Sequence, residues 1–215
     1  FAQAKPLVIN TASPPRLAML MELVTKEALR SLGYELRVNR QAGERALQNA
    51  NAGIEDGDGV RIAGLSSQYP NLIQVPEAYY DVEMSAFARD PAIRISGWKD
   101  LEKWRVGYLL GWKLYEENVK AAEISRVKET EALFRMLGFG RIDIALLQKL
   151  DGVAMARKLG LDEIRPLDPP LEVMPHYLYL NVRHRDLVPL LSAEIHRMKR
   201  DGRYAAIVER VLNEP

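Results

Sequence analysis

The stretch that decides the fold is PLVINTASPPRLAMLMELVTKEALRSLGYELRVNR, residues 6–40. Its opening run, PLVIN, is short and apolar and ends in a proline-containing turn, which predicts a strand. Apolar side chains then recur at helical spacing from Leu17 to Leu32, and Gly33 ends the pattern. Alternating apolar positions over residues 34–40 predict a second strand. A strand, a helix and a strand in this order indicate a parallel α/β unit.

The alternation of helix and strand continues through the rest of the chain. The stretch GERALQNANAG predicts a short helix, and VRIAGL, residues 60–65, predicts a third strand. Further along, RVGYLL (105–110) and RIDIALL (141–147) are predicted strands, each followed by a helical pattern. The sequence therefore predicts a second α/β unit after the first, and two helices close the chain.

Two extended segments bracket the second unit, at residues 82–90 and 172–182. Two such segments are expected where a chain crosses twice between lobes, because a simple linker would cross once. The sequence therefore predicts lobe 1 at residues 1–84 and 182–215, and lobe 2 at residues 85–181. A double crossing forms a hinge, and the cleft between two hinged lobes is a natural ligand site.

The composition excludes several classes of function. The 215 residues carry a formal net charge of +1, which gives no reason to expect binding to nucleic acid or to a membrane surface. Cysteine is absent, so disulfides and thiolate metal sites are excluded. Near the start, Ala2-Gln3-Ala4 matches the small-x-small end of a secretory signal peptide, although an unremarkable start is an equal alternative.

Three carboxylates lie between glycines in NANAGIEDGDGVRIAGL, residues 49–65. A calcium loop beginning at Asp56 would need ligands at positions occupied by Val60 and Ser67, so that pattern fails. Glu55, Asp56 and Asp58 are therefore predicted to belong to the turn between a helix and a strand, with a metal or catalytic role as the weaker alternative.

Four stretches carry a resemblance to a known family. They are LVINTASPP (7–15), GWKDLEKWRVGYLLGWKLYEE (97–117), LFRMLGFGRIDIALL (133–147) and IHRMKRDGRYAAIVERV (195–211). In this order and spacing they resemble the extracellular solute-binding proteins of family 3, which serve ABC transporters for polar amino acids. The resemblance covers nearly the whole chain and implies an α/β, two-lobed, periplasmic-binding-protein-like fold of type II.

The resemblance also implies a function. The chain is expected to be a periplasmic, exported, monomeric protein that captures a small polar solute in an interlobe cleft and delivers it to an ABC permease. Neither a cofactor nor an enzymatic activity is expected. One alternative is a sensory protein of the same fold that signals to a membrane partner. A further alternative is a dehydratase-type enzyme, for which Glu77 and His176 are the candidate acid and base.

The chain departs from the family pattern at both ends of the amino-acid recognition site. Residues 66–71 hold no arginine where family members clamp the α-carboxylate, and Leu147 and Gln148 stand where they place an acidic residue. These departures argue against an ordinary α-amino acid as the ligand. Basic side chains elsewhere favour an anionic solute.

The candidate ligand residues carry hydrogen-bonding, aromatic or basic side chains near predicted strand ends. Arg61 could replace the missing clamp, or could pair with Asp56 or Asp58. Trp112 could stack on a ligand with Lys113 adding charge, or could pack against its own lobe. The complete set is Thr11, Ser13, Arg45, Arg61, Tyr79, Trp112, Lys113, Gln148 and His176.

Overall fold

The computed structural model describes residues 6–11, 15–41 and 43–214. Ser13 and the Ala2-Gln3-Ala4 stretch lie outside the described residues. The chain divides into two compact units, the first formed by the described residues up to Asp81 together with Pro175–Glu214, and the second by Val82–Met174. The chain therefore passes between the units twice.

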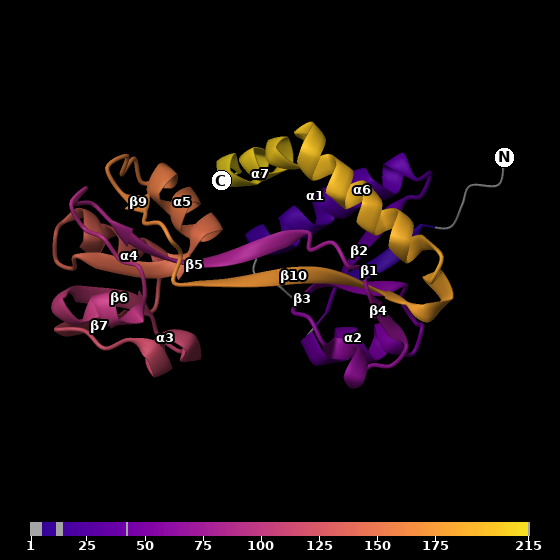
Figure 1. The fold of residues 1–215 in the computed structure, drawn as a ribbon, viewed down its shortest axis with the longest axis horizontal. Helices are drawn as coiled ribbons and strands as arrows, with labels where there is room; N and C mark the ends of the chain where they lie inside the picture. Colours follow the sequence, from indigo (N-terminus) through magenta and orange to yellow (C-terminus); the bar gives the residue numbers. More distant parts are fainter. Residues whose placement is uncertain (1–5, 12–14, 42, 215) are drawn as a thin grey trace. The chain divides into compact units, whose positions relative to one another are not determined.

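Unit 1 is a sheet with the strand order β2-β1-β3-β10, in which β4 also pairs with β10. Helix α1 lies on one face with α6 packed against it, and α2 lies on the other face (Figure 1). The elements are β1 (Leu7–Thr11), α1 (Pro15–Ser31), β2 (Leu36–Arg40), α2 (Gly43–Asn51), β3 (Gly57–Arg61), η1 (Leu65–Ser67), β4 (Leu72–Gln74), β10 (Glu172–Asn181), η3 (Val182–His184), α6 (Leu187–Asp201) and α7 (Arg203–Asn213).

The predicted helix and strands of residues 6–40 are confirmed. Strands β1 and β2 pair in parallel with Ile9 opposite Val38. The helical spacing of the sequence becomes the buried face of α1, where Leu20, Met21 and Val24 are fully inaccessible to solvent. The burial of this stripe against the sheet stabilises the helix more than its intrinsic propensity does.

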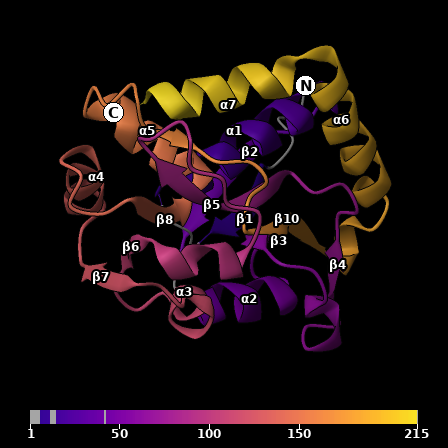
Figure 2. The same ribbon diagram turned by 60° about the vertical axis from the view of Figure 1, so that its left-hand side comes forward.

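Unit 2 is a sheet with the strand order β5-β8-β6-β7, and β9 pairs with β5 (Figure 2). The elements are β5 (Tyr80–Ala88), η2 (Trp98–Lys103), β6 (Arg105–Leu109), α3 (Lys113–Asn118), β7 (Glu123–Val127), α4 (Thr130–Gly138), β8 (Ile144–Gln148), α5 (Lys149–Lys158) and β9 (Arg165–Pro166). The short strand β9 has no counterpart in the prediction, because two residues are too few to show an alternating pattern.

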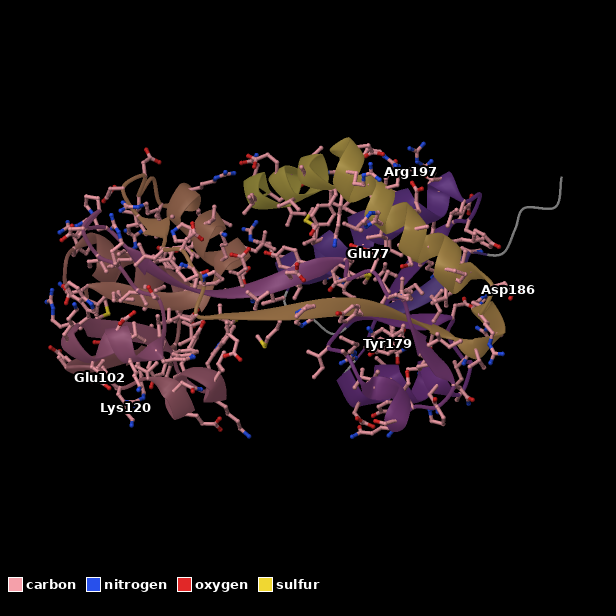
Figure 3. All side chains as sticks on the ribbon, in the orientation of Figure 1. Glu77, Glu102, Lys120, Tyr179, Asp186 and Arg197 are labelled. Carbon is pink, nitrogen blue, oxygen red and sulfur yellow. The ribbon has the colours of Figure 1, made fainter. Side chains whose placement is uncertain are left out.

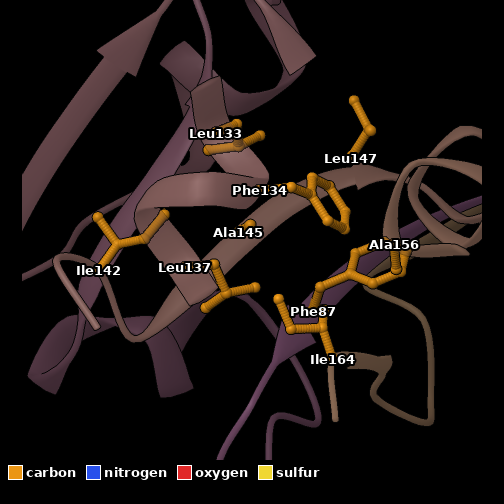
Figure 4. Packing of buried hydrophobic residues seen from close by; sticks show 9 residues of the cluster. All are labelled: Phe87, Leu133, Phe134, Leu137, Ile142, Ala145, Leu147, Ala156 and Ile164. Atoms are coloured by element: carbon orange, nitrogen blue, oxygen red, sulfur yellow. The ribbon is translucent and has the colours of Figure 1, made fainter. Parts of the chain in front are cut away.

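The core of unit 2 joins the sheet to α4 and α5. Phe87 of β5 and Phe134 of α4 meet edge to face, with ring centroids 5.3 Å apart, and neither ring is exposed (Figure 4). The cluster contains Phe87, Leu133, Phe134, Leu137, Ile142, Ala145, Leu147, Ala156 and Ile164.

The predicted strand at residues 60–65 is wrong in position, because β3 runs from Gly57 to Arg61. Its pairing with β10 is irregular between Asp58 and Arg61, and Val60 adopts a left-handed backbone with φ of 61°. A β-branched residue is rare in that conformation, and it marks a bulge that ends the strand. Gly57 and Gly59, which resemble turn glycines in the sequence, are strand residues: Gly57 lies close to the Tyr179 carbonyl, and Gly59 lies close to the Met21 side chain.

No helix among the described residues is long and apolar enough to span a bilayer.

Candidate functional site

Each unit places some of the predicted site residues at the switch point of its sheet. In unit 1, β1 lies between β2 and β3, and the connecting helices α1 and α2 cover opposite faces. The strand order therefore reverses between β1 and β3, and ligands of α/β sheets bind outside the carboxyl ends of strands at such a point. Thr11 ends β1 and Arg61 ends β3.

Unit 2 repeats this arrangement. Strand β6 lies between β7 and β8, so the order reverses between β6 and β8. Gly111 and Trp112 follow the carboxyl end of β6, and Gln148 ends β8. Four candidates from the sequence, Thr11, Arg61, Trp112 and Gln148, thus fall at the switch points of their own units.

Thr11 offers an unused hydrogen-bonding group at the end of β1. Its side chain is 1% exposed, and its Oγ1 has no hydrogen-bond partner among the described residues. The neighbouring Asn10 donates from Nδ2 to the Ala46 carbonyl over 3.2 Å, while its Oδ1 is equally unsatisfied. Buried polar atoms without partners are uncommon and indicate a place where water or a ligand binds.

Arg61 is held by Asp58 in a forked ion pair. Its Nε lies 2.5 Å from Asp58 Oδ1 and its Nη2 3.2 Å from Asp58 Oδ2, and Nη2 also donates to the Gly43 carbonyl. This is the pairing that the sequence left open as the alternative to a carboxylate clamp. The remaining nitrogen, Nη1, has no hydrogen bond within the described part of the chain, so Arg61 keeps its two N–H donors for a ligand.

The buried carboxyl group of Asp58 has a pKa raised to about 6, because burial disfavours its charged form more than Arg61 favours it. The folded protein therefore holds this proton more tightly than the unfolded chain. The contribution of Asp58 to stability is largest below about pH 4, falls as the pH rises to about 6, and is constant above that pH.

We predict that Asp58→Asn removes this pH dependence. The free energy of unfolding of the wild type, relative to the variant, should fall by up to about 3 kcal/mol between pH 4 and pH 7. Urea unfolding of both proteins at intervals across this range measures the difference. A difference that stays constant, or that rises with pH, would show that Arg61 keeps Asp58 ionised throughout.

In unit 2, Trp112 packs on its own helix. Its ring stacks on Tyr115 with centroids 5.5 Å apart and planes 12° apart. The Gly111 N–H, beside Trp112, donates to Glu116 Oε1 over 3.1 Å. Trp112 is half-buried, however, and Lys113 is exposed without a charged partner among the described residues. An aromatic surface and a free ammonium group therefore remain beside the end of β6.

The other candidates contribute unequally. Gln148 is buried, with no side-chain hydrogen bond to the described residues. Arg45 is exposed on α2. Tyr79 is fully buried, and its backbone N–H donates to the His176 carbonyl over 3.0 Å. Burial raises the pKa of Tyr79 well above its ordinary value, so its phenol stays neutral.

Glu77 is a poor candidate for an acid or base. Lys199 Nζ lies 2.6 Å from its Oε1, and His196 Nδ1 lies 3.2 Å from its Oε2. Burial alone would raise the pKa of Glu77, but these two partners outweigh it and hold the pKa below its ordinary value. The carboxylate, visible beside α6 in Figure 3, ties the segment before β5 to that helix.

The three carboxylates of the glycine-rich stretch 49–65 all have partners within the protein. Glu55 accepts from Gln41 Nε2 over 2.8 Å, and Asp56 accepts from the Val8 N–H and from His184 Nε2. Glu55 and Asp56 lie in bends, as predicted. Asp58 is a correction, because it lies within β3 rather than in the turn.

Sequence reasoning named Asp58 as a possible partner of Arg61, but it missed Asn10 as a neighbour of Thr11 and missed that Asp58 lies within a strand. The parallel pairing of β1 and β3 sets Asn10 opposite Asp58. The polar end of PLVIN was a signal for Asn10, since a buried strand that ends in asparagine often presents it at the sheet edge. No signal showed that Asp58 lies in a strand, because its flanking glycines are typical of turns.

Comparison with known proteins supports the fold. No protein-family model matches the chain. An uncharacterized protein of Shewanella oneidensis is 26% identical over 189 residues, which are 84% of this chain and 71% of that protein.

Several solved structures share the fold over the whole chain. The second substrate-binding domain of Lactococcus lactis GlnP, in an open conformation, matches with a TM-score of 0.72 at 15% identity over 100% of both chains. The ligand-binding core of GluR0 in complex with L-glutamate matches with a TM-score of 0.68 at 12% identity over 99% of this chain and 100% of that one.

A histidine kinase sensor domain with similarity to periplasmic binding proteins matches with a TM-score of 0.59 at 15% identity, again over 100% of both chains. Identities this low speak for the fold alone. The predicted fold class is confirmed: the chain has the α/β, two-lobed fold of periplasmic-binding-protein-like domains.

Proposed function

We propose that the chain is an exported solute-binding protein that captures a small polar, anionic solute for an ABC transporter. The observation that supports it most is the match in fold, over the full length of both chains, to the substrate-binding domain of GlnP. The repeated switch points support it further, because each unit brings candidate ligand residues to the end of its parallel strands.

The chemistry of the candidate residues favours an anion. Lys113 is exposed and unpaired among the described residues, and Nη1 of Arg61 is an available donor. Thr11 Oγ1 can donate to a carboxylate from a buried position. Trp112 adds a flat apolar surface for the carbon part of the solute.

A panel of solutes tests the proposal. Organic acids, amino acids and inorganic anions are added at millimolar concentration and the thermal unfolding midpoint is measured. A solute present at 100 times its Kd should add about 2.7 kcal/mol to the free energy of unfolding. The absence of any saturable shift across the panel would contradict solute binding.

Variants then locate the site. We expect Trp112→Ala and Lys113→Gln to weaken binding of the identified solute at least ten-fold, as measured by calorimetry. Lys120→Gln removes the same charge from another exposed position of unit 2 and should leave the affinity unchanged (Figure 3). Equal affinity in all three variants would remove Trp112 and Lys113 from the site. Arg61→Ala is unsuitable here, because it leaves Asp58 buried and unpaired and so perturbs folding.

A second candidate function is a sensory one. The histidine kinase sensor domain that shares this fold supports it. In this case the solute-bound protein would act on a membrane sensor instead of a permease. The solute panel gives the same positive result for both, and cross-linking in membranes with bound solute separates them by identifying the partner.

A further inference from the structure

Unit 2 contains a polar hollow beside the β9 edge of its sheet. It measures about 240 Å³ and is lined by Ile93, Arg94, Arg165, Pro166, Leu167 and Asp168. Ile93 and Leu167 are 3% and 6% exposed, so the apolar part of the lining belongs to the core of the unit. A hollow of this size holds several water molecules or one small organic molecule.

The lining carries an excess of positive charge. The charged lining residues are two arginines, Arg94 and Arg165, and one carboxylate, Asp168. The Asp168 side chain is 83% exposed and lies 4.0 Å from Lys149. Neither Arg94 nor Arg165 forms an ion pair with the described residues. Like charges that line one space repel each other, and an anion placed there would relieve that repulsion.

Both arginines have donors available, and their backbones are fixed. Arg94 Nη1 donates to the carbonyls of Pro91 and Ile93 over 2.6 and 2.9 Å, which orients the guanidinium and leaves its Nη2 and Nε unused within the described chain. Arg165 pairs with Ala88 in the β9–β5 ladder, and its half-buried side chain makes no hydrogen bond to the described residues. Because two hydrogen bonds already orient Arg94, its guanidinium loses little freedom on binding.

We propose that Arg94 and Arg165 form a binding site for a small oxyanion, a phosphate or a carboxylate, distinct from the proposed solute site. A guanidinium group presents parallel N–H donors that match the oxygens of either anion. Ile93, Pro166 and Leu167 offer apolar surface for a short apolar part of the ligand. Because Arg165 belongs to β9, an anion bound there would contact the β9–β5 edge of the unit.

The experiment is a titration of the full chain with inorganic phosphate, with sodium chloride as the reference at matched ionic strength. The readouts are the thermal midpoint and the ¹⁵Nε–¹H signals of the arginine side chains. We expect a saturable rise in the thermal midpoint and a saturable shift of two arginine signals. One of these two signals should be missing from the spectrum of Arg94→Gln and the other from the spectrum of Arg165→Gln. Each of these variants should bind phosphate at least ten-fold more weakly.

The matched control is Lys120→Gln, which makes the same charge change on unit 2 and should bind phosphate as the wild type does. Parallel titrations with sulfate and malonate separate a preference for tetrahedral anions from one for carboxylates. A response that does not saturate, or that is equal in Arg165→Gln, overturns the proposal. A response lost in Lys113→Gln but kept in Arg165→Gln also overturns it, while leaving the proposed solute site intact.

Discussion

Gly57→Ala is expected to destabilise unit 1 by more than about 3 kcal/mol. A Cβ atom at this position would overlap a backbone atom, lying 2.2 Å from the Tyr179 carbonyl oxygen, and would lie 2.9 Å from Ile9 Cδ1. The oxygen belongs to β10, where Leu180 pairs with Gly57. A backbone carbonyl in a ladder cannot turn aside as a flexible side chain can. The extra methyl group must therefore separate β3 from β10.

Chemical unfolding of the variant measures this loss, and Gly97→Ala is the matched control. Gly97 has an extended backbone, and no atom lies within 4 Å of its added Cβ. Alanine there restricts the unfolded chain without a clash, so the control should be neutral or stabilised by up to about 1 kcal/mol. Equal effects of the two substitutions would mean that β3 does not approach β10 as closely as described.

Most of the architecture could be predicted from the sequence, because a helix or strand with one buried face has apolar residues at regular intervals. The buried face of α1 and the alternation of β2 were readable for that reason. The exact position of β3 was not readable, since Gly57 and Gly59 serve close approach between elements that are far apart in the sequence. Only the tertiary structure distinguishes a strand glycine from a turn glycine.

The sequence proposed four residues that lie at the switch points of the two sheets, but it predicted few of their contacts. Thr11, Trp112 and Gln148 were proposed because each follows a predicted strand, where parallel sheets present polar groups, whereas Arg61 was proposed from within the predicted strand 60–65. Their partners depend on folding. The pairing of Arg61 with Asp58 was among the alternatives the sequence offered, but the bulge at Val60 was not, because no local pattern predicts a β-branched residue with positive φ. The hollow beside Arg94 and Arg165 joins segments about 70 residues apart, so spacing could not suggest it.

Gly152→Ala is the second substitution with a large expected effect, and it tests the core of unit 2. A Cβ at this position of α5 would lie 2.2 Å from Phe87 Cζ and 2.5 Å from Phe87 Cε2. The Phe87 ring is fully buried and packs edge to face on Phe134, so it has no open space to enter. Alanine favours a helix over glycine by about 1 kcal/mol, but overpacking costs about 1–3 kcal/mol and should exceed it.

The sign of this effect should reverse when the ring is removed. In a Phe87→Leu background the clash is relieved, so Gly152→Ala should stabilise the protein by up to about 1 kcal/mol through helix propensity alone. A double-mutant cycle from urea unfolding gives the interaction energy between the two positions. The same loss in both backgrounds would show that Phe87 does not oppose the methyl group. A reversal of sign would establish that glycine is required in α5 because it lets the helix pack directly on the Phe87 ring.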